Sequence, residues 1–179
     1  MPLVRPARAD DFDNIAALTN HFINTTSIHF SYQPVTPDEL RQLWQSKLHL
    51  YPWLVAEVDS TFAGYAKAGP WRERSAYQWT PEAGIYVEPR FHRQGIGRAL
   101  YLHLFDVLRA QGYHSLIGGL TLPNQASQRL HESLGFRPAG IVRRAGWKMN
   151  QWWDVAFYQY DLAHPDTPAQ TPIKPPQFD

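Results

Sequence analysis

Apolar positions along this chain of 179 residues recur with two periods, one typical of amphipathic helices and one typical of strands. The clearest helical spacing joins Leu100, Leu104 and Leu108, and it ends at Gly112, a residue that suits the left-handed end of a helix. The pattern predicts helices after Asp10 and over residues 36–47, 96–111 and 125–134. It predicts strands over residues 4–6, 53–58, 62–68, 82–87, 116–120, 138–144 and 152–162.

Local signals support two of these assignments. Thr36 and Glu39 flank Pro37 in the order of a capping box, in which both side chains satisfy free N–H groups at a helix start. The strands on either side of Asp59-Ser60-Thr61 are close enough in sequence to form a hairpin. The resulting order, β-α-α-β-β-β-α-β-α-β-β, predicts an α/β fold on a mixed sheet rather than a plain βαβ alternation.

The chain length predicts one domain, over residues 1–163, followed by a proline-rich tail over residues 164–179. Five prolines among the sixteen residues of this tail favour an extended conformation. Residues 70–80 show no clean period and are expected to form a loop, where binding residues are often found.

Composition narrows the classes of function. Lys and Arg number 17 against 16 Asp and Glu, and a net charge of +1 argues against a nucleic-acid-binding protein. The absence of cysteine excludes disulfides, thiolate metal sites and cysteine nucleophiles. The eight histidines show no metal-ligand spacing, so we expect no metal. The chain has no apolar run of signal-peptide or membrane-spanning length, and we expect a cytoplasmic protein with no membrane partner.

The segment from Arg93 to Arg98 places two glycines after a strand and at the start of the longest predicted helix. Glycines let a ligand approach the backbone, and the free N–H groups of a first helical turn attract an anion such as a pyrophosphate. The alternative is a flexible turn with solvated arginines, because a Gly-x-Gly pair is weak evidence by itself. A dinucleotide-binding motif is excluded, since Leu100 occupies the position of its third glycine.

Glu82 begins the strand that leads into this loop, and it shares one face of that strand with Gly84 and Tyr86. The glycine leaves room for a ligand beside the carboxylate. Partial burial would raise the pKa of the carboxyl group from about 4.3 toward a value suited to accepting a proton from an ammonium group. The alternative is a solvated glutamate at a strand end.

The sequence around the glycines resembles the GNAT family of N-acetyltransferases, whose signature is Gln/Arg-x-x-Gly-x-Gly/Ala. His92 stands where this signature has Gln or Arg. Asn124 before a helix and the run Leu134-Gly135-Phe136 match the second half of the family pattern, so the resemblance covers residues 4–162. Further motifs resemble the phosphinothricin acetyltransferase subgroup and its relatives that acetylate methionine sulfone and sulfoximine. These motifs are Gly69-Pro70-Trp71-Arg72, Tyr77-Gln78-Trp79-Thr80, Gly146-Trp147-Lys148 and Trp152-Trp153-Asp154-Val155.

The resemblance implies a mostly antiparallel sheet with flanking helices. It also implies a homodimer that transfers an acetyl group from acetyl-CoA to the α-amino group of a small amino-acid analogue, with Glu82 as a catalytic residue. The acetyl-CoA-binding residues that it implies are Ile85, Tyr86, Val87, Arg93, Gln94, Gly95, Ile96, Gly97, Arg98, Asn124 and Ser133.

His131 is the second candidate catalytic residue. It lies where many family members carry a tyrosine that protonates the departing thiolate, and a histidine can do the same. The subgroup resemblance favours substrate contact instead, and a histidine on a helix surface is a third possibility. Asn124 could likewise bind the CoA arm or simply cap its helix.

The acceptor is expected to carry anionic oxygens, which the planar guanidinium of arginine binds well. Arg72 and Arg74 lie on the loop before the strand of Glu82, although such a charged loop is also typical of plain solvation. The expected acceptor-binding residues are Phe30, Arg72, Arg74, Tyr77, Trp79, Tyr86 and Lys148.

Two other functions fit the same motifs. One is acetylation of a different amine, such as a protein N-terminus or a polyamine, although a polyamine site should be acidic and the loop at residues 72–74 is basic. The other is an acyl-CoA-binding sensor without turnover, against which the presence of Glu82 and both glycines argues.

Overall fold

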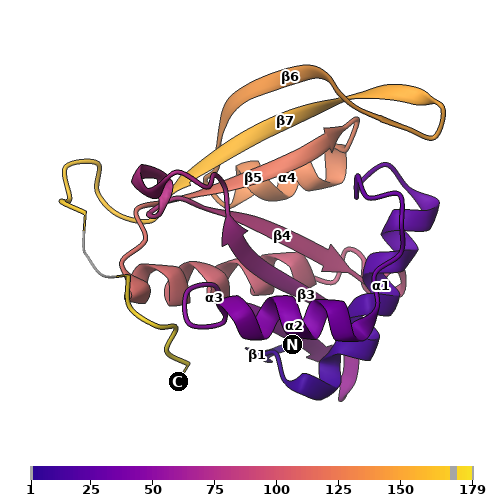
Figure 1. Cartoon of the computed structure of the whole chain (residues 1–179), viewed down its shortest axis with the longest axis horizontal. Helices are drawn as coiled ribbons and strands as arrows, with labels where there is room; N and C mark the ends of the chain where they lie inside the picture. Colours follow the sequence, from indigo (N-terminus) through magenta and orange to yellow (C-terminus); the bar gives the residue numbers. More distant parts are fainter. Residues whose placement is uncertain (1, 170–172, 179) are drawn as a thin grey trace.

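The computed structural model describes residues 2–169 and 173–178, which form a seven-stranded sheet with helices on both faces (Figure 1). The strand order is β1-β2-β3-β4-β5-β7-β6. Neighbouring strands are antiparallel except β4 and β5, which are parallel. The element order and the mostly antiparallel sheet confirm the fold predicted from the sequence.

The bounds of the elements lie close to those predicted. The strands are β1 (Leu3–Pro6), β2 (Trp53–Val58), β3 (Thr61–Pro70), β4 (Pro81–Val87), β5 (Ser115–Leu122), β6 (Arg137–Lys148) and β7 (Gln151–Asp161). The α-helices are α1 (Phe12–Thr25), α2 (Pro37–Lys47), α3 (Ile96–Gln111) and α4 (Gln125–Ser133), and short 3₁₀ turns cover Ala9–Asp11, Ser75–Tyr77 and Pro89–Phe91.

Helix ends and turns follow the chemistry of their residues. Thr36 Oγ1 accepts the Glu39 N–H at 3.2 Å, and the Glu39 carboxylate accepts the Thr36 N–H at 2.7 Å, which completes the capping box before α2. Gly112 ends α3 with a φ of 95°. Asp59 and Ser60, with φ of 48° and 59°, form the two-residue turn that joins β2 to β3.

Two separate apolar clusters attach the helices to the two faces of the sheet. Helices α1 and α2 cover one face, where Phe12 and Tyr65 are buried. Helices α3 and α4 cover the other face, around Leu104. In Figure 1, α1 and α2 lie in front of the sheet and α3 lies behind it. Side chains of β4 belong to both clusters, because Tyr86 packs with the first and Ile85 with the second.

The parallel pairing between β4 and β5 is short. It consists of Glu82 opposite Ile117 and Ala83 opposite Gly118, whereas β4 and β3 pair along the whole of β4. Beyond Ala83 the two strands separate, as the ribbons in Figure 1 show. The facing backbone edges of β4 and β5 therefore have no partner strand over the described residues that follow this pairing.

Strand β6 continues beyond its predicted end at Arg144 to Lys148. The register of β6 against β7 shifts between Val142 and Gly146, and Arg144 has a φ of 49°. This irregularity breaks the two-residue alternation by which a strand is predicted from sequence.

The described parts of the proline-rich tail, residues 164–169 and 173–178, contain neither helix nor strand. Ile173 is nevertheless buried against the cluster around α3, and the Lys174 N–H donates to the Gln111 carbonyl at 3.0 Å. No helix in residues 2–169 or 173–178 has the length and apolar character needed to cross a membrane.

Candidate active site

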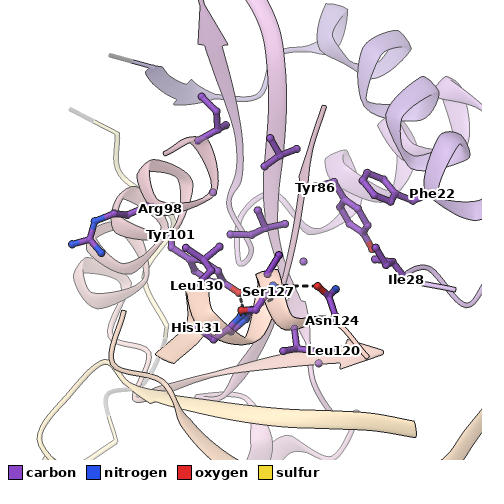
Figure 2. A pocket seen from close by; sticks show the side chains of 18 of the residues that line it. Phe22, Ile28, Tyr86, Arg98, Tyr101, Leu120, Asn124, Ser127, Leu130 and His131 are labelled. Carbon is purple, nitrogen blue, oxygen red and sulfur yellow. Dashed lines mark hydrogen bonds between the residues drawn. The ribbon is translucent and has the colours of Figure 1, made fainter. Parts of the chain in front are cut away.

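A cavity of about 790 Å³ lies where β4 and β5 separate. All six residues from Glu82 to Val87 line it, so both faces of β4 contribute to its wall. Figure 2 shows Phe22, Ile28 and Tyr86 on one side of this space, with the α3 and α4 side chains on the other. The cavity therefore passes through the sheet, with one end toward α1 and the other toward α3 and α4.

The start of α3 forms the second of these ends. Gly95 caps the helix with a φ of 80°, and Arg93 before it has a φ of 61°. The N–H groups of the first helical turn have no partners within the helix, and Gly95, Gly97 and Arg98 all line the cavity. Free N–H groups, the helix dipole and two exposed arginines give this end the character of an anion-binding site.

The edge of β4 forms the wall between the two ends. Ile85 and Val87 line the cavity, in the part of the strand that no longer pairs with β5. His92 Nε2 lies 3.1 Å from the Val87 carbonyl oxygen, and since a carbonyl only accepts, the ring donates this bond. His92, which stands where the signature has Gln or Arg, thus forms a hydrogen bond with the end of β4.

Glu82 lies at the point where the cavity crosses the sheet. Burial raises the pKa of its carboxyl group, and the positive charges of Lys67 and Arg72 oppose part of that rise. Gly119 of β5 lies beside this carboxylate, because a Cβ atom there would be 3.0 Å from Glu82 Oε1. The carboxyl group is thus enclosed and its pKa is raised, as a general base that works near neutral pH requires.

His131 is buried in the wall on the α3 and α4 side and forms two short hydrogen bonds. Its Nδ1 lies 2.8 Å from the Ser127 carbonyl oxygen, so Nδ1 carries the hydrogen. Its Nε2 lies 2.6 Å from the Tyr101 hydroxyl. Burial lowers the pKa of His131, while the Ser127 carbonyl opposes the shift, and a neutral ring accepts the Tyr101 O–H at Nε2. Figure 2 shows this Tyr101–His131 pair beside Leu130.

The site thus combines anion-binding amides at a helix start, strands that separate after a short parallel pairing, and an enclosed carboxylate between them. The model of the Acetyltransferase (GNAT) family matches residues 15–136. The chain belongs to the GNAT family of N-acetyltransferases. It is an enzyme that transfers an acetyl group from acetyl-CoA to an amine.

Relatives with assigned activities cover almost the whole chain. A phosphinothricin N-acetyltransferase of Streptomyces viridochromogenes is 43% identical over 172 residues, which are 96% of this chain and 93% of that protein. An L-methionine sulfoximine/L-methionine sulfone acetyltransferase of Salmonella typhimurium is 34% identical over 161 residues, 89% of this chain and 94% of that protein.

A solved structure of a GNAT superfamily phosphinothricin acetyltransferase from Sinorhizobium meliloti, in complex with acetyl-CoA, superposes with a TM-score of 0.91. It is 29% identical, and the match covers 97% of this chain and 96% of that one.

The cavity of this GNAT enzyme fits acetyl-CoA on its own geometry. The amides at the start of α3 and the guanidinium groups of Arg93 and Arg98 suit a pyrophosphate. The unpaired edges of β4 and β5 offer N–H and C=O groups to an extended amide-containing arm. Asn124 lines the cavity as well, and its Oδ1 accepts the Ser127 N–H at 3.1 Å as the cap of α4.

Two of the predicted acetyl-CoA residues point elsewhere. Gln94 Nε2 donates to the Arg90 carbonyl at 3.1 Å, and Ser133 Oγ donates to the Leu130 carbonyl at 2.8 Å. Neither Gln94 nor Ser133 lines the cavity. The other predicted acetyl-CoA residues do: Ile85, Tyr86, Val87, Arg93, Gly95, Ile96, Gly97, Arg98 and Asn124.

The ammonium group of Lys148 is bound within the protein. Its Nζ donates to the carbonyl oxygens of Ile23, at 2.6 Å, and of His29, and the side chain is buried. These bonds connect β6 to the end of α1 and the segment after it, so Lys148 does not face the cavity. Phe30 also lies outside the lining and covers Gly146, where a Cβ atom would collide with its ring.

The loop residues predicted to bind the acceptor also lie outside the lining of the cavity. Arg72 is exposed and stacks on Trp71 at 5.1 Å, but its charge still acts on Glu82. Arg74 and Tyr77 are exposed, and Trp79 packs against the cluster around α3. Of the predicted acceptor residues, Tyr86 alone lines the cavity.

Three features of the site were missed in the sequence. Lys67 lines the cavity, and its signal is a single lysine in an otherwise apolar run, since lysine is rarely buried without a partner. Tyr101 faces His131 from a different helix, a pairing for which the sequence gives no signal. Gly118 leaves space for His131 on one face of β5, and Gly119 leaves space for Glu82 on the other face. The signal in the sequence is a pair of glycines inside a buried strand, which indicates that other side chains approach the backbone closely there.

The Tyr101–His131 hydrogen bond generates a prediction about stability. Tyr101→Phe keeps the ring but leaves His131 Nε2 buried without a donor, which is expected to lower the free energy of unfolding by about 1–3 kcal/mol. Urea unfolding measures this change. The matched control is Tyr160→Phe, whose hydroxyl accepts from the exposed Arg109 at 2.6 Å, and its effect should stay within about 0.5 kcal/mol. Equal stability of the two variants would contradict the buried pairing.

Proposed function

We propose that this enzyme acetylates the α-amino group of a small amino-acid analogue of the phosphinothricin, methionine sulfone or methionine sulfoximine type. The observation that carries the proposal is Glu82, an enclosed carboxyl group of raised pKa in a cavity whose other end suits the pyrophosphate of acetyl-CoA. The activities of relatives that align with almost the entire chain support this acceptor class.

Bound acetyl-CoA supplies the acetyl group as an activated thioester. Glu82 accepts a proton from the acceptor's ammonium group, directly or through a water molecule, and so frees the amine for attack. The backbone of Ile85 and Val87 orients the donor's arm, while the start of α3 holds its phosphates. The reaction thus takes place where β4 and β5 separate.

The Tyr101–His131 pair forms the wall on the α3 and α4 side of the cavity, whereas Glu82 lies on the opposite face of the sheet. For His131 to protonate the departing thiolate, its ring would have to carry a proton on Nε2, which burial opposes. We therefore assign His131 first to fixing the Tyr101 hydroxyl, and with it the shape of this wall. Donation of a proton through the pair is the second assignment.

The loop at residues 71–80 supplies further acceptor contacts in this proposal. Arg72 is the first of these, since its charge already acts on Glu82. Arg74 and Tyr77 follow it on the same exposed loop, and Trp79 lies near the end of this loop, before β4; Phe30, which packs on Gly146, is included in the proposal as well. A guanidinium group there suits the phosphinate or sulfone oxygens at the far end of the acceptor.

We further propose a cytoplasmic homodimer whose catalytic unit is residues 1–163, with residues 164–179 as a tail. Support for the dimer comes from the hairpin of β6 and β7, which extends from one end of the sheet (Figure 1). Its surface carries the exposed apolar side chains of Ile141, Val142 and Trp152, the last of them 57% exposed. Exposed large apolar side chains gathered on one hairpin are typical of an interface between copies.

The acceptor class is tested with an assay of the thiol released from acetyl-CoA. We expect turnover with phosphinothricin, methionine sulfone or methionine sulfoximine, and far less with polyamines or an N-terminal peptide. Turnover with the peptide or a polyamine alone would establish another acceptor. Acetyl-CoA binding without any thiol release across the panel would favour the sensor function.

Replacing the proposed base tests the mechanism. Glu82→Gln should lower kcat by about 100-fold to 10,000-fold at pH 7 and leave acetyl-CoA affinity unchanged, because the shape remains and the base is lost. The defect should shrink at high pH, where the amine loses its proton unaided. In the native enzyme, kcat should fall as pH drops through the raised pKa of Glu82, since a protonated carboxyl group cannot accept a proton.

The control for this measurement is Glu88→Gln, which removes a carboxylate just after the same strand but outside the cavity. Its kcat should equal that of the native enzyme. A Glu82→Gln variant that is equally active at pH 7 would remove Glu82 from the mechanism.

The proposed dimer is tested by placing a charge on the hairpin. Ile141→Glu should produce a monomer in analytical ultracentrifugation, because a buried interface does not accommodate an unpaired carboxylate. The matched control is Leu102→Glu on α3, which is also exposed, and it should remain dimeric. Dissociation of both variants alike, or of neither, would argue against an interface at this hairpin.

A further inference from the structure

Lys67 is the one cationic side chain at the α1 end of the cavity, among the described residues that line it. On β3, Lys67 lies opposite Gly84 and Gly69 lies opposite Glu82, so the side chains of Lys67 and Glu82 lie on the same face of the sheet. The lysine extends across Gly84, where a Cβ atom would be 3.6 Å from Lys67 Cε. The lysine therefore occupies the space next to the proposed base.

The ammonium group of Lys67 has an aromatic neighbour but no anionic partner. Its Nζ lies over the Trp53 ring, 5.0 Å from the centroid. No carboxylate within the described part of the chain lies within 4.0 Å of this nitrogen, although the charge of Glu82 acts on it from farther away. Burial lowers the pKa of Lys67, as expected for a cation without a close counter-ion.

The ionisable groups near Lys67 do not supply a counter-ion for its ammonium group. His29 is close enough for Lys67 and Lys148 to affect it, and burial together with these charges lowers the pKa of His29 to about 4. A neutral imidazole does not compensate the lysine. Lys148 is itself held by the Ile23 and His29 carbonyls. For an anion at the α1 end of the cavity, Lys67 is therefore the cationic side chain that the lining offers.

We propose that Lys67 binds the α-carboxylate of the acceptor and thereby makes this enzyme select α-amino acids over simple amines. The inference rests on the proposed function. An α-amino acid carries its ammonium and carboxylate groups on one carbon, and the cavity presents a carboxylate and an ammonium group on one face of two paired strands. The acceptor's amine faces Glu82 and its carboxylate faces Lys67, which leaves the far end of the acceptor for Arg72.

The test compares methionine sulfone with the amine that remains when its α-carboxylate is removed, and with its α-carboxamide. For native enzyme we expect a large ratio of kcat/KM for the amino acid to kcat/KM for either analogue. Lys67→Met should reduce this ratio by about 10-fold to 100-fold, as expected when a charged hydrogen bond is lost. Lys67→Arg should preserve most of the ratio because it keeps the charge.

The ratio of kcat/KM values separates the contact between Lys67 and the α-carboxylate from other effects of Lys67 on turnover. If Lys67 only adjusts the pKa of Glu82, its removal changes turnover of all three acceptors alike and the ratio stays at the native value, which would overturn the proposal. Lys67→Gln provides a second neutral variant should Lys67→Met fail to fold. Lys47→Met, at the exposed end of α2, is the matched control and should leave every rate unchanged.

Calorimetry provides a readout besides turnover. Methionine sulfone should bind the native enzyme loaded with CoA more tightly than it binds the loaded Lys67→Met variant, and the carboxamide should bind both equally. Equal affinities of the amino acid for both proteins would overturn the proposal. A native enzyme that acetylates neither the amino acid nor its analogues would instead refute the proposed function itself.

Discussion

The short parallel pairing between β4 and β5 is the constraint on which the site depends. A sheet interior normally satisfies every backbone N–H and C=O group, yet here the pairing stops after Ala83 and Gly118. The rest of β4 still pairs with β3, and β5 pairs with β7, so the opening is held rigidly from both sides. A ligand with an extended amide-containing arm can then take the place of the missing strand, which is why donor binding and catalysis occupy one cavity.

The same opening determines the electrostatics. A cavity that crosses the sheet gives Glu82 access to ligand while its surroundings still raise its pKa by burial. Lys67 and Arg72 limit that rise, so the carboxyl group keeps its ionised form at a lower pH than burial alone would allow. Gly118 and Gly119 complete the arrangement, because a Cβ atom at Gly118 would collide with His131 and one at Gly119 would make a tight contact with Glu82.

The parts of this molecule that were predictable from sequence are those in which neighbouring residues carry the signal. Thr36 caps the helix that follows it, and Gly95 lies within the turn that it permits before α3. The contacts of Lys67 and Tyr101 could not be assigned in this way, because their partners come from another strand and another helix. Lys148 shows the converse: its motif suggested the substrate, but the fold uses its ammonium group to bind two carbonyls.

Donor and acceptor ends of the cavity differ in the kind of group that lines them. The donor end depends on backbone amides at the start of α3 and on the edge of β4, which most substitutions leave in place. In our proposal the acceptor end depends on the side chains of Glu82 and Lys67, which line the cavity, and of Arg72 beside it, each of which a single substitution can replace. Substitutions at the acceptor end can therefore change which acceptor is used without disturbing acetyl-CoA binding. Relatives 43% and 34% identical to this chain carry the names of different acceptors, as this separation allows.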